Sequence, residues 1–305
     1  MTDSQDPAPD TALPLRTGAL LLDMDGTLID SGPAVERSWN TLLRELGTDL
    51  RFGHAHHGMP ARRILAQILP EASEAELDAA HRRIEELEMQ DVEGIVVLPG
   101  TERLLAELDA AAETLGRASW TIVTSCTRPL FEARWSRTGL PVPEGLVTAD
   151  QVTHGKPDPE PYLLGAERVG VEPSRTVVLE DSVGGLRAGI AAGARTVAVT
   201  TTTPAGELSP LADALVTSLD DLEVRVEGED PSSPAAEADR RAAPAPSAAA
   251  SLIPLGGPTG PSRALRTTSP TSSPHGGERP DRGRSRPPRK DSSHVRNRRH
   301  LRIRR

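Results

Sequence analysis

The stretch LLLDMDGTLIDS, residues 20–31, places two aspartates directly after an apolar run that begins at Ala19. A short, nearly continuous run of this kind is typical of a strand that is buried on both faces of a parallel sheet. Asp23 and Asp25 stand two residues apart, so in an extended chain their carboxylates point the same way and repel each other. Such a pair at the end of a buried strand indicates a chemical function for the two carboxylates.

Three further apolar runs of similar length follow, and helical patterns separate them. One helical pattern keeps an apolar face from Leu104 to Leu115 and ends at Gly116. Strands that alternate with helices in this way predict an α/β fold whose core is an open, Rossmann-like parallel sheet. The three runs are residues 119–125, 176–181 and 196–201.

Residues 32–97 break this alternation, because they contain three helix-like segments and no strand pattern before the stretch GIVVLPG. The third segment opens with a capping box formed by Ser73 and Glu76. We therefore predict a small helical cap domain at residues 32–97. It is inserted between the two parts of a Rossmann-like catalytic core, residues 18–31 and 98–227.

The two ends of the chain differ from this body. Residues 228–305 are rich in Pro, Ser and Ala and then in Arg, and they contain no aromatic residue. Such a segment buries too little apolar surface to offset the entropy lost on ordering, so we predict a disordered C-terminal tail over residues 228–305. We also predict that residues 1–17 form a flexible N-terminus.

Charge divides the chain at the same border. The tail has 16 basic and 7 acidic residues, whereas residues 1–227 have 19 basic and 37 acidic ones. An acidic body argues against a nucleic-acid surface. The Arg-rich tail could contact phosphates, but it lacks the aromatic residues that stacking on bases requires, so we do not expect nucleic acid as a partner.

The location of the protein is predicted from its single cysteine and its apolar runs. Cys126 has no second cysteine with which to form a disulfide, and we interpret it as a small packing residue in a reducing compartment. The polar, acidic N-terminal stretch is unlike a signal peptide, and every apolar run is far shorter than a membrane helix. These features predict a cytoplasmic protein without a membrane partner.

Polar side chains gather where the predicted strands end, and ligands of open α/β sheets bind beyond the carboxyl ends of the strands. Besides Asp23 and Asp25, one strand ends at Thr124 and Ser125, and another ends at Glu180 and Asp181. Carboxylates that meet at one edge need a hard divalent cation, and an all-oxygen site suits Mg²⁺. Mg²⁺ is therefore the predicted cofactor.

A lysine adds to this set. The chain has only two lysines, Lys156 and Lys290, against 33 arginines, and Lys156 lies in the stretch HGKPDPEPY just before a predicted helix. We interpret Lys156 as a compact positive charge that holds a phosphate oxygen and Asp23 together.

Four stretches resemble, in order and spacing, the motifs of the haloacid dehalogenase superfamily of phosphohydrolases. They are DMDGTLIDS, IVTS, GKPDPEPY and VVLEDSVGGLRAG, and the resemblance covers residues 18–225. The inserted helices are similar to the cap of one subclass. The stretches VTSCTRPLFEARW and LVTADQVTHGKPDPEPYLLGA are most similar to glycerol-phosphate and 2-deoxyglucose-6-phosphate phosphatases.

The resemblance implies a role for each motif residue. Asp23 would be the nucleophile that forms an aspartyl-phosphate, and Asp25 would be the general acid and then the general base. Thr124 and Lys156 would hold the phosphoryl oxygens. The implied Mg²⁺ ligands are the carboxylates of Asp23 and Asp181, the carbonyl of Asp25 and, directly or through water, Glu180.

The resemblance also implies contacts with the substrate, from Ser125 in the core and from His57 and Gly58 in a cap loop. Trp39 of the first cap helix would be either a wall of the substrate site or part of the cap core. Gly184, Gly185 and Gly189 would allow either a close approach to the metal site or tight packing of a helix on the sheet.

The sequence thus predicts a Mg²⁺-dependent phosphatase that hydrolyses small sugar or polyol phosphates, which are its expected partners. Two alternatives stay open at this point. One is a sugar phosphomutase of the same fold, and the other is a non-catalytic interaction protein that uses the basic tail.

Overall fold

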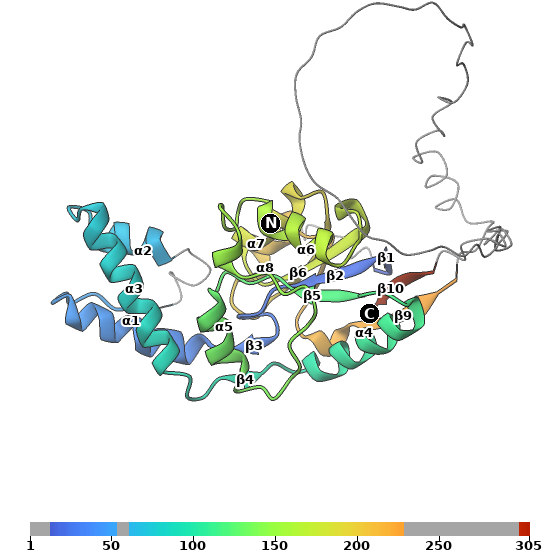
Figure 1. Cartoon of the computed structure of the whole chain (residues 1–305), viewed down its shortest axis with the longest axis horizontal. Helices are drawn as coiled ribbons and strands as arrows, with labels where there is room; N and C mark the ends of the chain where they lie inside the picture. Colours follow the sequence, from blue (N-terminus) through green and yellow to red (C-terminus); the bar gives the residue numbers. More distant parts are fainter. Residues whose placement is uncertain (1–12, 54–60, 229–298) are drawn as a thin grey trace, which may run out of the picture. The chain divides into compact units, whose positions relative to one another are not determined.

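The central element is a parallel sheet of five strands in the order β5-β2-β6-β7-β8. The computed structural model describes residues 13–53, 61–228 and 299–305, and Figure 1 shows the sheet with helices on both sides. Four of the strands lie in the four apolar runs of the sequence, and β8 was not predicted. The strands are β2 (Ala19–Leu22), β5 (Trp120–Ile122), β6 (Thr176–Glu180), β7 (Arg195–Val199) and β8 (Ala214–Val216).

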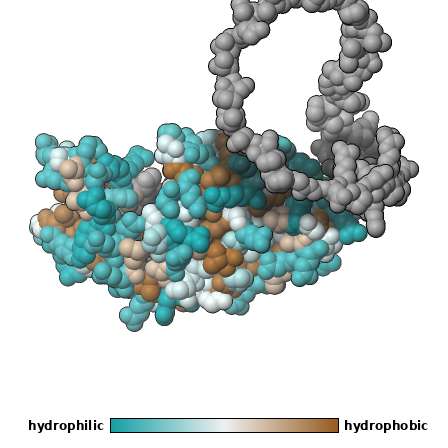
Figure 2. All heavy atoms as spheres, in the orientation of Figure 1, coloured by the Kyte–Doolittle hydropathy of each residue, from teal (hydrophilic) through white to brown (hydrophobic). Residues whose placement is uncertain are grey.

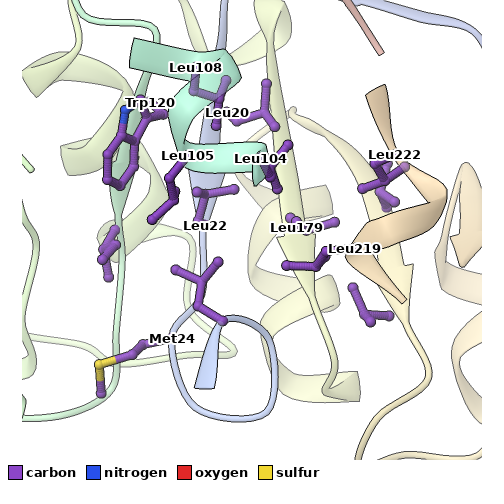
Figure 3. Packing of buried hydrophobic residues seen from close by; sticks show 14 of the residues in the cluster. Leu20, Leu22, Met24, Leu104, Leu105, Leu108, Trp120, Leu179, Leu219 and Leu222 are labelled. Carbon is purple, nitrogen blue, oxygen red and sulfur yellow. The ribbon is translucent and has the colours of Figure 1, made fainter. Parts of the chain in front are cut away.

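Alternate residues of the strands supply two apolar layers. Leu20 and Leu22 face one layer, which helices α4 (Thr101–Leu115) and α5 (Arg128–Trp135) cover. Figure 3 shows these leucines against α4, Trp120 and Leu179. Ala19 and Leu21 face the other layer, under α6 (Glu160–Arg168) and α7 (Val183–Ala191). Burial on both faces explains why the strands are nearly continuous apolar runs.

Shorter helices complete the core. Helix α8 (Ala205–Leu208) packs through Leu208 on the α7 side of the sheet. Hydrophilic residues cover most of the face that Figure 2 shows, as expected when apolar side chains are turned toward two inner layers. Within the described residues, single 3₁₀ turns lie at Ala149–Gln151, Pro173–Arg175, Ser209–Leu211 and Leu219–Asp221.

The residues between β3 and β4 form a helical unit with its own apolar cluster. Strands β3 (Ile29–Asp30) and β4 (Val96–Val97) pair antiparallel, so the chain leaves and re-enters the core through one ribbon. Between them lie α1 (Gly32–Glu45), α2 (Ala61–Ile68) and α3 (Glu74–Gln90). The capping box of Ser73 and Glu76 is present at the start of α3. The predicted fold class, a Rossmann-like parallel sheet with helices inserted after its first strand, is confirmed.

A second sheet corrects the prediction for the two ends of the chain. Strands β1 (Leu15–Thr17), β10 (His300–Arg304) and β9 (Glu223–Glu227) pair antiparallel, with β10 in the middle. The predictions of a flexible segment up to residue 17 and of a disordered tail up to residue 305 are therefore wrong for residues 15–17 and 300–304. The rest of both predictions, at residues 1–12 and 229–298, lies outside the described residues.

Strand β10 is held in place by two of its side chains, which stand two residues apart and so point to the same face, toward the core. Leu301 and Ile303 are fully buried and join the apolar layer beneath α4 and α5. On the other face, Glu227 accepts hydrogen bonds from Arg302 at 3.0 Å and from Arg304. The arginines of this strand are thus paired within the sheet. In the described ranges no helix has both the length and the apolar character that crossing a membrane requires.

Replacing Leu301 or Ile303 with alanine should lower the free energy of unfolding by about 2–5 kcal/mol, because each change leaves a cavity in the core. Urea denaturation followed by tryptophan fluorescence measures the loss. Arg305→Ala, a change at an exposed residue just beyond β10, is the control and should have little effect. Unchanged stability in both core variants would mean that β10 does not dock in solution.

Candidate active site

Three buried carboxylates meet at the carboxyl edge of the parallel sheet. Asp23 follows β2, Glu180 ends β6 and Asp181 comes next, and the two strands are paired neighbours. Each side chain offers an oxygen within 4.8 Å of the others, and all three residues are buried. Because adjacent parallel strands end at the same edge, these residues converge as the sequence analysis expected.

Lys156 supplies the positive charge in this cluster. From the loop before α6, its ammonium donates hydrogen bonds to Asp23 Oδ1 at 2.6 Å, Glu180 Oε1 at 2.7 Å and the carbonyl of Val123 at 2.9 Å. Burial opposes the charge on the lysine, but Asp23 and Glu180 outweigh this effect and raise the pKa of Lys156 above its ordinary value. The lysine therefore stays protonated and joins the ends of two strands.

Tyr162, the single tyrosine of the chain, was missed by the sequence analysis. It is fully buried on α6, and its hydroxyl donates a hydrogen bond to Glu180 Oε1 at 2.9 Å. The Lys156 ammonium lies 4.8 Å from the centre of the tyrosine ring. The sequence offered one signal for Tyr162: it ends the stretch GKPDPEPY, and so it lies in the first turn of the helix that follows Lys156.

Glu180 is held on both of its oxygens. While Oε1 accepts from Lys156 and Tyr162, Oε2 accepts from the Ser182 hydroxyl at 2.9 Å and from the backbone N–H groups of Asp181 and Ser182 at 3.1 Å. A side chain at Gly185 would overlap this carboxylate. Gly185 therefore allows a close approach to the site.

Gly189, in contrast, serves the packing of a helix on the sheet. An added Cβ there would lie 3.1 Å from Val178 and 3.2 Å from Thr196, which are residues of the sheet. Gly189 therefore allows tight packing of α7 on β6 and β7, away from the carboxylates.

Asp181 is fixed by two threonines that the sequence analysis did not identify. Thr27 donates a hydrogen bond to Oδ1 at 3.2 Å, and Thr202, from the loop after β7, donates to Oδ2. Gly26 has a φ of +84°, and a side chain there would overlap Asp181. Burial and the charge of Glu180 raise the pKa of Asp181 to about 7.

The described hydrogen-bond partners of the Asp25 carboxylate lie outside this cluster. Its Oδ1 accepts hydrogen bonds from Ser31 Oγ at 2.6 Å and Arg134 Nη1 at 2.9 Å, and its Oδ2 accepts one from Cys126 Sγ at 3.1 Å. The carboxylates of Asp23 and Asp25 thus have different partners. Cys126 is buried, as expected of a packing residue, and it also contacts Asp25.

The remaining predicted site residues have different positions. Thr124 is buried at the end of β5, and its hydroxyl accepts a hydrogen bond from the backbone N–H of Cys126 at 3.1 Å, whereas Ser125 is exposed. Trp39 lies in the apolar core of the cap with its ring stacked 5.1 Å from that of Phe52. It is 2% exposed, so the cap-core alternative describes it. His57 and Gly58 lie outside the described residues.

The donor set of the cluster fits Mg²⁺. All candidate ligands are oxygens, which hard cations prefer. Burial, together with repulsion from Glu180, raises the pKa of Asp23 as well as that of Asp181, although Lys156 opposes the shift at Asp23. When all three carboxylates are ionised, their negative charge exceeds the single positive charge of Lys156. A divalent cation would relieve this repulsion.

Known proteins share this architecture. A profile of the haloacid dehalogenase-like hydrolase family matches residues 17–193. Hexitol phosphatase A of Escherichia coli is 39% identical over 211 residues, which are 69% of this chain and 95% of that protein. Glycerol-1-phosphate phosphohydrolase 2 of Saccharomyces cerevisiae is 32% identical over 203 residues, 62% of this chain and 77% of that protein.

A solved structure agrees with these sequence relatives. The structure of CbbY from Rhodobacter sphaeroides in complex with phosphate has a TM-score of 0.57 at 26% identity, and the match covers 67% of this chain and 95% of that one. The parallel sheet, the inserted helices and the lysine-bridged carboxylates define a hydrolase of the haloacid dehalogenase type. The chain belongs to the haloacid dehalogenase-like hydrolase family. The predicted family, with sugar-phosphate phosphatases as relatives, and the predicted hydrolytic enzyme are confirmed.

The raised pKa of Asp181 predicts how pH and metal affect stability. Without metal, Asp181 is more protonated in the folded protein than in the unfolded chain between about pH 4 and pH 7, so its contribution to the free energy of unfolding should fall as pH rises through this window. Mg²⁺ neutralises the ionised carboxylates, so it should raise the melting temperature more near pH 8 than near pH 5.

Thermal melting with EDTA or with Mg²⁺ at the two pH values measures this effect. Asp181→Asn should weaken both the fall in stability and the response to Mg²⁺, whereas Asp213→Asn, at a residue outside the cluster, should change neither. An equal Mg²⁺ effect at both pH values would contradict the assigned cluster.

Proposed function

We propose that this protein is a Mg²⁺-dependent phosphatase that hydrolyses small sugar or polyol phosphates through an aspartyl-phosphate on Asp23. The observation that carries the proposal is the ion pair between Lys156 and Asp23, 2.6 Å apart within a buried carboxylate cluster. Such a pair gives a carboxylate at which a phosphoryl group can be received and a cation that can hold its oxygens.

The chain's own groups can carry out both steps of the reaction. Asp23 attacks phosphorus, and the bond from phosphorus to the ester oxygen breaks as Asp25 gives its proton to the leaving alkoxide. In the second step Asp25 takes a proton from the water that attacks the phosphoryl group, which frees Asp23. Thr124 and Lys156 hold the phosphoryl oxygens during both steps.

The proposed metal ligands are the carboxylates of Asp23 and Asp181 and the carbonyl of Asp25. Bound Mg²⁺ would supply positive charge that offsets the charges of the phosphoryl oxygens and of the attacking carboxylate. Glu180 already accepts hydrogen bonds on both oxygens, which favours the alternative in which it acts through water. In this role it fixes Lys156 beside Asp23.

The substrate class rests on the relatives and on the cap. Hexitol phosphatase A and glycerol-1-phosphate phosphohydrolase 2 are named for small polyol phosphates, and this chain spans most of the length of each. Three helices inserted beside the carboxyl edge of the sheet suit a small substrate that is enclosed during the reaction. Ser125 stays a proposed substrate contact from the core.

The phosphomutase alternative is less well supported. A mutase must hold a sugar and its second phosphate, which requires several free cationic groups on the cap. Arg62, one of two adjacent cap arginines, is paired with Glu74 and Asp78 of α3. The interaction-protein alternative is also weakened, since Arg302 and Arg304 are paired with Glu227.

Asp23→Asn should abolish phosphate release, with a loss of about three orders of magnitude or more, because the amide cannot form the acyl phosphate. The rate is measured as phosphate released from glycerol 1-phosphate in the presence of Mg²⁺. Asp30→Asn is the matched control, since Asp30 lies in the same segment but hydrogen-bonds only the backbone N–H of Gly32 among the contacts described. A near wild-type rate in Asp23→Asn would rule out the covalent mechanism.

The product separates phosphatase from mutase. We expect the wild-type protein to release inorganic phosphate from several short sugar and polyol phosphates without a bisphosphate activator, since water is the proposed acceptor. Phosphorus NMR of the reaction mixture resolves free phosphate from sugar phosphates. An isomerised sugar phosphate as the main product would overturn the proposal in favour of the mutase.

A further inference from the structure

Arg134 is a buried arginine that joins Asp25 to the cap. It lies on α5, and its side chain is 6% exposed. Nη1 donates to Asp25 Oδ1 at 2.9 Å and contacts Cys126 Sγ at 3.2 Å, while Nη2 lies 3.3 Å from Glu88 Oε2 on cap helix α3. One guanidinium therefore bridges a carboxylate of the core and a carboxylate of the cap.

The partners of Asp25 show what this bridge adds. Ser31 and Cys126 also donate to Asp25; Ser31 is the N-cap residue at which cap helix α1 begins, and Cys126 lies just after β5 of the core. Among the donors described for Asp25, Arg134 is the one whose side chain also contacts cap helix α3. The Asp25 carboxylate is therefore connected to α3 through the Arg134 side chain, in addition to its contact with the residue that begins α1.

Glu88 is itself held firmly on the cap side. Its side chain is 13% exposed, and burial raises its pKa although Arg134 and a hydrogen bond with Trp39 oppose the shift. Trp39 belongs to the apolar core of the cap. The contacts thus run from the cap core through Glu88 and Arg134 to the Asp25 carboxylate.

The chemistry of arginine makes this bridge rigid. A guanidinium is planar, presents its N–H groups in a fixed fork and stays charged when buried. Two carboxylates bound to one such fork keep a fixed separation, and removing either partner leaves a buried charge without full compensation. A shift of the carboxylate by about 1 Å can cost a reaction roughly a hundredfold in rate.

We propose that Arg134 is a positioning residue that orients the Asp25 carboxylate for proton transfer and ties this orientation to cap helix α3 through Glu88. The inference rests on the proposed function, in which Asp25 protonates the leaving alkoxide. It adds two residues outside the four motifs to the groups on which the reaction depends.

The test compares two substrates whose leaving groups differ in their need for a proton. Glycerol 1-phosphate releases an alkoxide, which requires the acid, whereas acetyl phosphate releases acetate, which does not. The measured quantity is kcat/KM, because it covers the steps up to departure of the leaving group and excludes the later attack by water. Arg134→Lys keeps the charge but not the fork, and Glu88→Gln removes the cap carboxylate with little change in shape.

Arg134→Lys should lower kcat/KM for glycerol 1-phosphate by about ten- to a hundredfold, a part of the roughly 10²–10⁴ that positioned acid catalysis contributes. The value for acetyl phosphate should change by less than about threefold, because Asp25 is not needed as an acid there. Glu88→Gln should shift the ratio of the two values in the same direction by a smaller factor.

The matched control is Glu85→Gln. Glu85 lies three residues before Glu88 on α3 and also contacts the core, by accepting a hydrogen bond from Thr127, but no contact with Asp25 or Arg134 is described for it. This variant should leave the ratio unchanged. If Arg134→Lys does not fold, as judged by circular dichroism, the test is the ratio of the two kcat/KM values in Glu88→Gln compared with that in Glu85→Gln.

Equal losses for both substrates, or an unchanged ratio in Arg134→Lys and Glu88→Gln, would overturn the inference and leave Arg134 a structural ion pair. Asp25→Asn provides the reference, since it should show the largest difference between the substrates. If the wild-type protein released phosphate from neither substrate, the proposed function itself would fail. Activity with a clear Asp25→Asn effect but no Arg134 effect would overturn the inference alone.

Discussion

The constraint on which the site depends is the burial of three carboxylates around one ammonium. Asp23, Glu180 and Asp181 are all buried, and Lys156 contacts the first two. Removing one member of a buried ion pair typically costs about 3–5 kcal/mol, so each member requires the others. The surrounding residues follow from this requirement: threonines hold Asp181, Ser182 and Tyr162 hold Glu180, and Gly26 and Gly185 leave room for the carboxylates.

The parallel sheet determines where this cluster can form. Strands β2 and β6 are neighbours in register, so the residues after their last rungs meet at one edge without any long loop. The same edge receives the Lys156 loop before α6 and the cap ribbon of β3 and β4. The buried apolar strands therefore fix the position of the backbone. The first polar residues that follow them then become the reactive groups.

The parts predicted from the sequence were those encoded in consecutive residues. Buried strands appear as apolar runs, and the residues that end them could be assigned to one edge, so the convergence of Asp23, Glu180 and Asp181 could be foreseen. Contacts between distant segments could not. Thr202 and the pair of Arg134 and Glu88 reach the site from elements whose packing no local pattern encodes. Strand β10 was missed because its two apolar residues stand in an Arg-rich stretch, where average composition hides the alternation.

The position of β10 has a consequence for how the chain folds during synthesis. Strand β1 pairs with β10 alone in its sheet, and Leu15 lies opposite Ile303. Strand β1 is made long before β10, so it cannot complete this pairing until residue 303 has been made. Contacts between such distant positions carry a large loop-closure entropy and form late. The apolar core residues that Leu301 and Ile303 cover therefore stay exposed in the nascent chain, where they can contact other chains until β10 docks.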